Sequence, residues 1–307
     1  MSKLIIYILV LACIVISAYS LLSAPKKSTY LDLAKKLYEN GDYKQAIEFI
    51  DKSSDKDTVN LDRAYNLRGI CNYNLKKYDI ALLDLNKSLV LINQKLEHQT
   101  KADQIKDLNS IKTNTYFNRA LVYQELSELD SAINDYTYVI NNDKSNKFAY
   151  FNKGFIFYQK QMNDSALLYF SQVLSIDSND MDALYNQANI YYELNNCEKA
   201  QIAYYKLITN KRADEFVYLN MADCEFRNKN YEQSINDYSQ SIKINKFMLS
   251  AYYNRAQAYK VTKKFNESLK DLKFVLENIG KDINFANRGD EIQNEISNLQ
   301  KFIKGNK

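Results

Sequence analysis

Few residues in this 307-residue chain have the types and spacing that catalysis or metal binding needs. The sequence has one histidine, His98, and four widely separated cysteines, which excludes a multi-histidine metal site and a CxxC zinc site. His98 follows Glu97 without a second titratable residue at ligand spacing, and we expect it to be exposed to solvent. The sequence offers no nucleophile–base pair and no phosphate-binding loop. It therefore predicts a protein that is not an enzyme and has no cofactor or metal.

The composition indicates a helical, folded chain. Only 6 Gly and 1 Pro interrupt it, and 46% hydrophobic with 25% charged residues is typical of a protein with a buried core. The 41 basic and 37 acidic residues give a net charge of +4, without the concentrated basic face that phosphate binding requires. We expect no nucleic-acid partner and no small-molecule substrate.

Residues 1–26 are expected to be a membrane anchor or a signal segment. Leu4–Leu22 carry no charge, and as a helix they would be about 28 Å long, close to the thickness of a bilayer core. A cleaved signal peptide is also consistent, with Ala18-Tyr19-Ser20 as the cleavage site. A lipoprotein signal ending at Cys13 ranks third, because the chain stays apolar after it. All three interpretations remain open.

The side of the membrane is also open. More lysines follow the apolar segment than precede it, which would keep the chain in the cytoplasm. The signal-like start favours export instead, and we prefer export. The expected location is therefore membrane-associated through residues 4–22, or exported.

A 34-residue period runs through most of the chain. Five similar strings follow one another without a slip of register: Tyr116-Phe117-Asn118-Arg119-Ala120, Tyr150-Phe151-Asn152-Lys153-Gly154, Leu184-Tyr185-Asn186-Gln187-Ala188, Tyr218-Leu219-Asn220-Met221-Ala222 and Tyr252-Tyr253-Asn254-Arg255-Ala256. Two looser units precede them, so that seven units start near residues 27, 62, 113, 147, 181, 215 and 249.

These units resemble the tetratricopeptide repeat family, whose unit is a helix–turn–helix with small residues at positions 8 and 20. Here all fourteen such residues are Ala, Gly or Ser, which lets helix A and helix B of a unit approach closely. We expect the large residues at positions 4 and 24 to form the core around this contact. They are Tyr30, Tyr65, Tyr116, Tyr150, Tyr218 and Tyr252 at position 4, and Ile50, Leu85, Tyr136, Phe170, Tyr204, Tyr238 and Leu272 at position 24.

The predicted fold is all-α: a right-handed superhelical solenoid of about seven repeats over residues 27–282, with a capping helix and tail over 283–307. The cap is indicated by an apolar stripe of Ile292, Ile296, Leu299 and Ile303. Units two and three are 51 residues apart, so an insertion lies near residues 94–112. We expect prolonged helices there, joined by a polar turn near residues 97–101.

The resemblance implies that helix A lines a concave groove that binds peptides. Asparagine occupies position 6 in five successive units, and such a row can bond the backbone of an extended peptide. Aromatic residues at positions 5 and 12 add apolar area. The candidate groove residues are Asn118, Asn152, Asn186, Asn220, Asn254, Phe117, Phe151, Tyr185, Tyr253, Tyr158, Tyr192 and Phe226. The plainer alternatives are that asparagine is common throughout this sequence, and that several rings are partly buried between adjacent helices.

The remaining reactive side chains have structural interpretations. Cys71, Cys197 and Cys224 are expected to be buried thiols, although a Cys197–Cys224 bridge is conceivable in an oxidising compartment. Aspartates recur at position 23, one per unit, as on a solvated face: Asp84, Asp135, Asp237 and Asp271. Arg119 and Arg255 occupy position 7 and should point away from the groove.

The sequence thus favours an interaction scaffold or adaptor, membrane-tethered or exported, that binds peptide segments or partner helices in its groove. The alternative is a non-catalytic accessory subunit that recruits substrates to an enzyme or transport complex.

Overall fold

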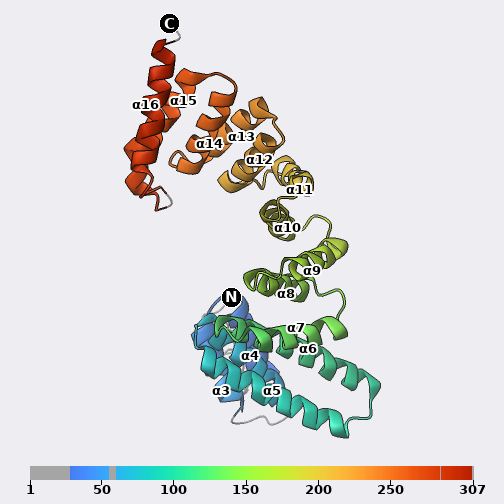
Figure 1. Ribbon diagram of the computed structural model, residues 1–307. Coiled ribbons are helices and arrows are strands. Elements are labelled where there is room, and N and C mark those ends of the chain that lie inside the picture. The colour runs from blue at the N-terminus through green and yellow to red at the C-terminus, as the bar shows by residue number, and fades with distance from the viewer. Residues whose placement is uncertain (1–27, 55–59, 284, 306–307) are drawn as a thin grey trace, which may run out of the picture. The chain divides into compact units, whose positions relative to one another are not determined.

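A computed structural model describes residues 28–54, 60–283 and 285–305, which form fifteen α-helices and one short 3₁₀ helix (Figure 1). No strand occurs within these ranges, so the predicted all-α fold is confirmed. The apolar segment of residues 4–22 lies outside the described residues. Among the helices that the structure describes, none combines the length and apolar character needed to cross a membrane.

The chain divides into two compact units, one ending at Ala149 and the other starting at Tyr150. The first unit contains three helix pairs in which each helix packs against the next along the chain. The pairs are α2 (Ser28–Glu39) with α3 (Tyr43–Ser54), α4 (Leu61–Asn74) with α5 (Tyr78–His98), and α6 (Ala102–Glu125) with α7 (Leu129–Asn142).

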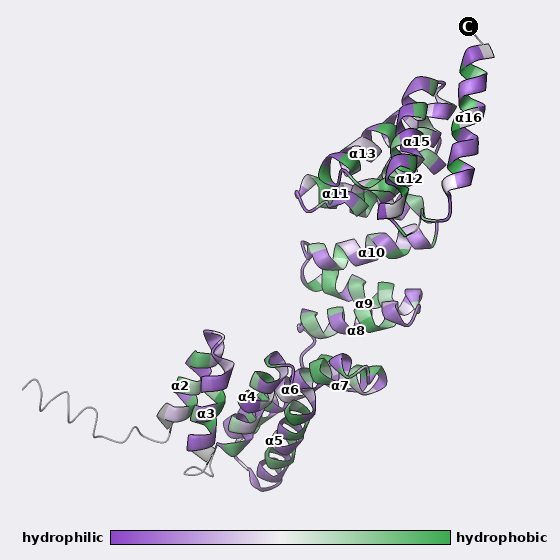
Figure 2. Ribbon diagram, turned by 90° about the vertical axis from the view of Figure 1, so that its left-hand side faces the viewer, coloured by the Kyte–Doolittle hydropathy of each residue, from purple (hydrophilic) through white to green (hydrophobic). Residues whose placement is uncertain are grey.

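The second unit continues the pattern from α8, at whose start the boundary falls. Its pairs are α8 (Lys147–Gln159) with α9 (Asn163–Ile176), α10 (Met181–Glu193) with α11 (Cys197–Thr209), α12 (Glu215–Arg227) with α13 (Tyr231–Ile244), and α14 (Leu249–Val261) with α15 (Phe265–Asn278). The 3₁₀ helix η1 (Ile279–Lys281) leads to α16 (Gly289–Gly305). Helix α16 packs on α15 and buries Ile292, Ile296 and Leu299, so the predicted capping helix is confirmed. Polar and apolar residues lie side by side along these amphipathic helices (Figure 2).

The turn inside each pair has the same backbone geometry in all seven repeats. Position 15 has a positive φ each time, between 57° and 65° for the six residues that are not glycine and 85° for Gly41. The six are Lys76, Ser127, Gln161, Asn195, Lys229 and Lys263. The next backbone N–H reaches back five residues, as from Lys77 to the Asn72 carbonyl at 2.8 Å. In six of the seven repeats this left-handed helix end closes helix A without the glycine that usually occupies it.

Close helix crossing is the common feature of the repeats. Every residue at positions 8 and 20 is buried, and every residue at position 24 is at most 1% exposed, as predicted. A Cβ added to Gly69 would lie 2.7 Å from Cγ of Leu85, and one added to Gly154 would lie 3.1 Å from Cβ of Tyr169. The two helices at these points are therefore as close as their backbones allow.

The position-4 rings differ from expectation, because they are only half-buried. Two of them stack on rings of helix B: Tyr116 on Tyr138 with centroids 3.9 Å apart, and Tyr252 on Phe274 at 4.2 Å. These tyrosines seal the side of the repeat, whereas position 24 fills its centre.

The insertion is helical, as expected, and its turn is shorter than predicted. Helix α5 extends to His98 and α6 begins at Ala102, leaving only residues 99–101 between them. The side-chain oxygen of Gln99 accepts the backbone N–H groups of Thr100 and Lys101, both at 3.0 Å, which closes the turn. His98 is exposed, but it lies at a helix end and not in irregular chain.

The helix crossing makes Gly69→Ala a destabilising change. We expect the free energy of unfolding to fall by roughly 1 kcal/mol, since overpacking at Leu85 outweighs the better helix propensity of alanine. Gly280→Ala is the control, because nothing lies within 4 Å of its added Cβ, and it should be neutral or stabilising. Urea denaturation of both variants measures the difference, and equal stabilities would contradict the tight crossing at Gly69.

Candidate peptide-binding surface

The five position-6 asparagines lie half-buried on successive A helices. Asn118 belongs to α6 in the first unit, and the other four belong to α8, α10, α12 and α14 in the second. The second unit also has a pocket of about 240 Å³ that contains one of them, Asn254. Its lining comes from α12, α13 and α14 and consists of Asp223, Phe226, Arg227, Tyr238, Asn254 and Gln257. Two candidate residues, Phe226 and Asn254, therefore meet at one pocket.

Several of these asparagines bond to the preceding repeat. The amide nitrogen of Asn118 donates to Oδ1 of Asn66 at 3.3 Å, that of Asn220 to the hydroxyl of Tyr204 at 3.2 Å, and that of Asn254 to Oδ1 of Asp223 at 2.9 Å. Asn186 instead donates to a carbonyl of its own helix, that of Asp182, at 2.8 Å. A peptide carbonyl would have to exchange with these acceptors for the same amide N–H groups.

The aromatic candidates at position 5 pack partly into the repeat. The ring of Phe117 meets Tyr136 edge-on with centroids 5.8 Å apart, and Phe151 meets Phe170 in the same way at 5.5 Å. Tyr253 contacts Phe285 at 5.8 Å beside the capping helix. These rings are half-buried, so each keeps some area that a ligand could contact.

The position-12 tyrosines connect neighbouring A helices. Tyr158 donates its hydroxyl to Glu193 of the next repeat at 2.5 Å, and Tyr192 donates to Asp223 at 2.6 Å. Burial, followed by the bond to Glu193, raises the pKa of Tyr158 to about 12. These hydroxyls therefore remain protonated donors at neutral pH, and they fix the register between repeats.

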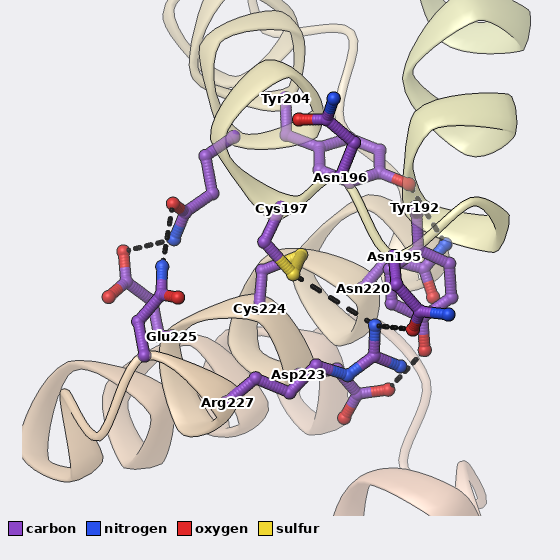
Figure 3. Close-up of a disulfide and its surroundings, with 12 residues drawn as sticks. Tyr192, Asn195, Asn196, Cys197, Tyr204, Asn220, Asp223, Cys224, Glu225 and Arg227 are labelled. Atoms are coloured by element: carbon purple, nitrogen blue, oxygen red, sulfur yellow. Dashed lines mark hydrogen bonds between the residues drawn. A yellow bond between two sulfur atoms is a disulfide. The ribbon is translucent and has the colours of Figure 1, made fainter.

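Asp223 is a candidate binding residue that the sequence alone did not reveal. Its carboxylate accepts bonds from Tyr192 at 2.6 Å, from Tyr238 at 2.5 Å and from Asn254 at 2.9 Å, which come from α10, α13 and α14. Arg227 lies over the ring of Tyr192, 4.8 Å from its centroid (Figure 3). The only signal in the sequence was an acidic residue at a groove position, one turn before Arg227.

The recurring aspartates at position 23 correct a prediction, because they are buried and not solvated. Asp84, Asp135 and Asp271 are at most 5% exposed, and each receives two bonds from the position-7 arginine of its own repeat. In the third repeat, Arg119 Nε and Nη2 lie 2.7 and 2.8 Å from the two oxygens of Asp135. The guanidinium also covers the position-4 ring, at 5.0 Å for Arg119 and Tyr116. Arg119 and Arg255 thus point away from the candidate surface, as expected.

The sixth repeat has the buried aspartate without the arginine. Met221 stands at position 7, and Asp237, 5% exposed, receives its bonds from the neutral amide of Gln233 at 3.3 and 3.2 Å. Burial raises the pKa of Asp237, and the nearby charge of Glu225 acts in the same direction. Ionising this carboxyl group costs free energy without the arginine that lowers the cost in part at Asp135, where burial still raises the pKa.

The cysteines correct a second prediction. Cys71 is a buried thiol, and burial raises its pKa to about 12. Cys197 and Cys224 are buried too, but they form a disulfide between α11 and α12, with Cα atoms 5.2 Å apart (Figure 3). Within the described ranges no cluster of three or more His, Cys, Asp or Glu residues is arranged to hold a metal ion.

Comparisons with known proteins agree with this architecture. The tetratricopeptide repeat model matches residues 149–180, 182–210 and 217–247. A search of the curated proteins finds no significant match to the sequence. Consecutive helix pairs with small residues at each crossing define a helical-repeat solenoid protein. The chain contains tetratricopeptide repeats, which the family model matches within residues 149–247.

Solved structures show the same fold at low sequence identity. The C-terminal part of a TPR repeat-containing protein from Cytophaga hutchinsonii is 20% identical with a TM-score of 0.66, over 83% of this chain and 98% of that one. A tetratricopeptide repeat protein from Parabacteroides merdae is 17% identical with a TM-score of 0.53, over 90% and 99%. YrrB, described as a TPR protein with an unusual peptide-binding site, is 18% identical with a TM-score of 0.53, over 62% and 98%. The fold supports a protein–protein interaction scaffold, and the family is generally non-catalytic.

The unpaired aspartate gives a pH-dependent prediction. Asp237→Asn should raise the free energy of unfolding at pH 7, because it removes the cost of a buried negative charge. The folded-state pKa of Asp237 is raised, so its unfavourable contribution grows as pH rises from the unfolded value of about 3.9 through the folded-state pKa. The gain in the variant should therefore shrink toward pH 4.

Asp271→Asn is the matched control, and urea denaturation at several pH values compares the two. Asp271→Asn should lower the free energy of unfolding at pH 7, since it leaves Arg255 without its carboxylate partner. Changes of the same sign at Asp237 and Asp271 would show that the arginine partner makes no difference.

Proposed function

We propose that this chain is an interaction scaffold that binds an extended peptide segment or a partner helix along the A helices of its second unit. The observation that carries this proposal is the pocket between α12 and α14, where an aromatic ring, a carboxylate and an amide lie together: Phe226, Asp223 and Asn254. The ring offers apolar area, and the polar groups offer acceptors and donors to a peptide backbone. Binding positions a partner and involves no reaction.

The likeness to YrrB supports the peptide as a ligand class, since that protein is described as having a peptide-binding site. In this chain the neighbouring A helices would continue the surface from Asn254 through Asn220 to Asn186, one residue per repeat. Binding would use amide groups that now join repeats, so each new bond to the peptide would replace a bond between repeats. The apolar contacts would then supply most of the net affinity.

Export or membrane tethering belongs to the same proposal. Its support is the apolar segment of residues 4–22 together with the Cys197–Cys224 disulfide, because disulfides form and persist mainly in oxidising compartments. The role as an accessory subunit of an enzyme or transport complex is the alternative, and the number of partners separates it from an adaptor.

The groove prediction is tested by changing Asn186, Asn220 and Asn254 together to Ala. We expect binding of the purified chain to extended peptides on an array to weaken by about tenfold, since three lost bonds of about 0.5 kcal/mol each together remove about 1.5 kcal/mol, and about 1.4 kcal/mol is a tenfold change. The control changes three exposed asparagines on helix B, Asn134, Asn236 and Asn266, and should keep full binding.

The outcomes of this comparison are distinct. Peptide binding that survives the A-helix triple change would place the site elsewhere, and equal losses in both triples would indicate a general loss of structure. Co-purification then counts partners: an adaptor loses several with the A-helix variant, whereas an accessory subunit loses one.

The N-terminal segment is tested separately by alkaline extraction of membranes followed by N-terminal sequencing. A membrane anchor should stay with the membrane pellet and keep its original N-terminus. A cleaved signal should release a chain that begins shortly after Ser20, and a lipoprotein should begin at a blocked Cys13. A full-length chain in the soluble fraction would contradict both tethering and export.

A further inference from the structure

The two sulfur atoms of the Cys197–Cys224 disulfide have unequal surroundings. Cys197 is the first residue of α11 and is 8% exposed, whereas Cys224 lies inside α12 and is fully buried. The bond spans 27 residues and ties helix B of one repeat to helix A of the next (Figure 3). An incoming thiol therefore has more access to the Cys197 side of the bond than to the Cys224 side.

Two positively charged features lie next to the sulfur of Cys197: the guanidinium of Arg227 and the N-terminus of α11. Nη1 of Arg227 lies 3.9 Å from its sulfur, held there by stacking over Tyr192 and by a 3.0 Å bond to Oδ1 of Asn195. The sulfur also lies at the N-terminus of a thirteen-residue helix, where unpaired N–H groups carry partial positive charge. Both features stabilise a thiolate relative to a thiol.

Two acidic groups around the pair accept hydrogen bonds from other side chains and not from the cysteines. Asp223 accepts from Tyr192, Tyr238 and Asn254, and Glu225 accepts from Gln201 and Asn230 at 2.8 and 2.7 Å. Glu198 follows Cys197 in the first turn of α11 and is exposed to solvent, which screens its charge. Arg227 is the charged side chain that contacts the sulfur of Cys197.

We propose that Cys197 is a thiol–disulfide exchange site, opened by dithiol reductants and held as a thiolate by Arg227 when reduced. One thiolate of the reductant attacks the sulfur of Cys197 and forms a mixed disulfide, while Cys224 leaves and takes a proton. The second thiolate of the reductant attacks the reductant's own sulfur, which releases Cys197 as a thiolate and leaves the reductant as a cyclic disulfide. Two electrons pass to the protein, and a stabilised thiolate is the better leaving group in the second step.

This site lies directly behind the candidate pocket, although its chemistry does not depend on peptide binding. Asp223 and Arg227 both line that pocket, and they flank Cys224 along α12. Opening the bond removes the covalent link between α11 and α12 at the point where Arg227 and Tyr192 meet. The oxidised chain therefore holds this wall of the pocket more rigidly than the reduced chain.

The first test measures the reactivity of Cys197 in the full chain after reduction with dithiothreitol and removal of the reductant. Iodoacetamide labelling from pH 5 to 10, followed by mass spectrometry, gives the pH midpoint of alkylation for each cysteine. The midpoint for Cys197 should lie at least one pH unit below the value of about 8.5 for a free cysteine. Cys71 is the internal control, since burial raises its pKa to about 12.

Variants at Arg227 test whether its guanidinium group lowers the pH midpoint of Cys197 alkylation. Arg227→Gln should move the Cys197 midpoint upward toward that of a free cysteine, and Arg227→Lys should keep it low because the charge remains. Arg288→Gln makes the same change on a ring-stacked arginine that contacts Tyr253, and it should leave the midpoint unchanged. A midpoint at or above the ordinary value in the unaltered chain, or no response to Arg227→Gln, would overturn the proposal.

The second test follows the disulfide itself. Dithiothreitol without denaturant should open the bond in the folded chain. In the Cys224→Ser variant, the free Cys197 thiolate should attack oxidised glutathione and form a mixed disulfide, releasing one glutathione thiolate. A bond that opens only when the chain unfolds would overturn exchange in the native state.

Discussion

The structure depends on the close approach of two helices in each repeat. Positions 8 and 20 are small because the backbones cross there, and the gap beside Leu85 at Gly69 is too narrow even for a methyl group. Large side chains are then confined to the flanks of the crossing, where position 24 is fully buried and position 4 half-buried. Each pair keeps an apolar face that it cannot bury alone, so neighbouring pairs stack and the last face needs a cap. Helix α16 supplies that cap in the second unit through Ile292, Ile296 and Leu299.

Two polar systems lie on opposite sides of this crossing. On one side, a position-7 arginine bonds the position-23 aspartate of its own repeat and covers the position-4 ring, so this system fastens helix A to helix B. On the other side, tyrosine hydroxyls and asparagine amides reach from one A helix toward the next and meet at carboxylates such as Asp223. The first system also reaches the preceding repeat, through Arg119 to Asn86 and through Arg255 to Ser239, so both systems join repeats. The second system contains the candidate residues Tyr192 and Asn254, so the candidate surface and the stacking interface share residues.

The features that could be predicted from the sequence are those that depend on the repeat period and on residue size. A 34-residue spacing with small residues at two positions was enough to place the helix pairs, the buried position-24 residues and the capping stripe at Ile292 and Ile296. Which side chains bond to each other could not be predicted from the sequence, because the spacing of residues along the chain does not give the distances between helices. Asp135 has the spacing of a solvated residue, and only the helix crossing brings Arg119 to it, while Asp223 has no sequence signal beyond its charge. The same limit applies to Cys197 and Cys224, whose contact arises from the way α11 meets α12.

A ligand that binds at residues joining two repeats must change the bonds between those repeats. The amide of Asn254 and the hydroxyl of Tyr192 both reach Asp223, so a ligand that takes one of these donors changes the bonds between α10, α12 and α14. Stacking of neighbouring repeats is the main source of stability in a solenoid, and any ligand that strengthens or weakens it acts on the fold as well as on the pocket. The Cys197–Cys224 bond opposes such movement where α11 meets α12, because a covalent link restricts how far the two helices can separate. Under the two proposals, a ligand that displaces Tyr192 from Asp223 and a reductant that opens the disulfide would both act on the contact of the fifth repeat with the sixth.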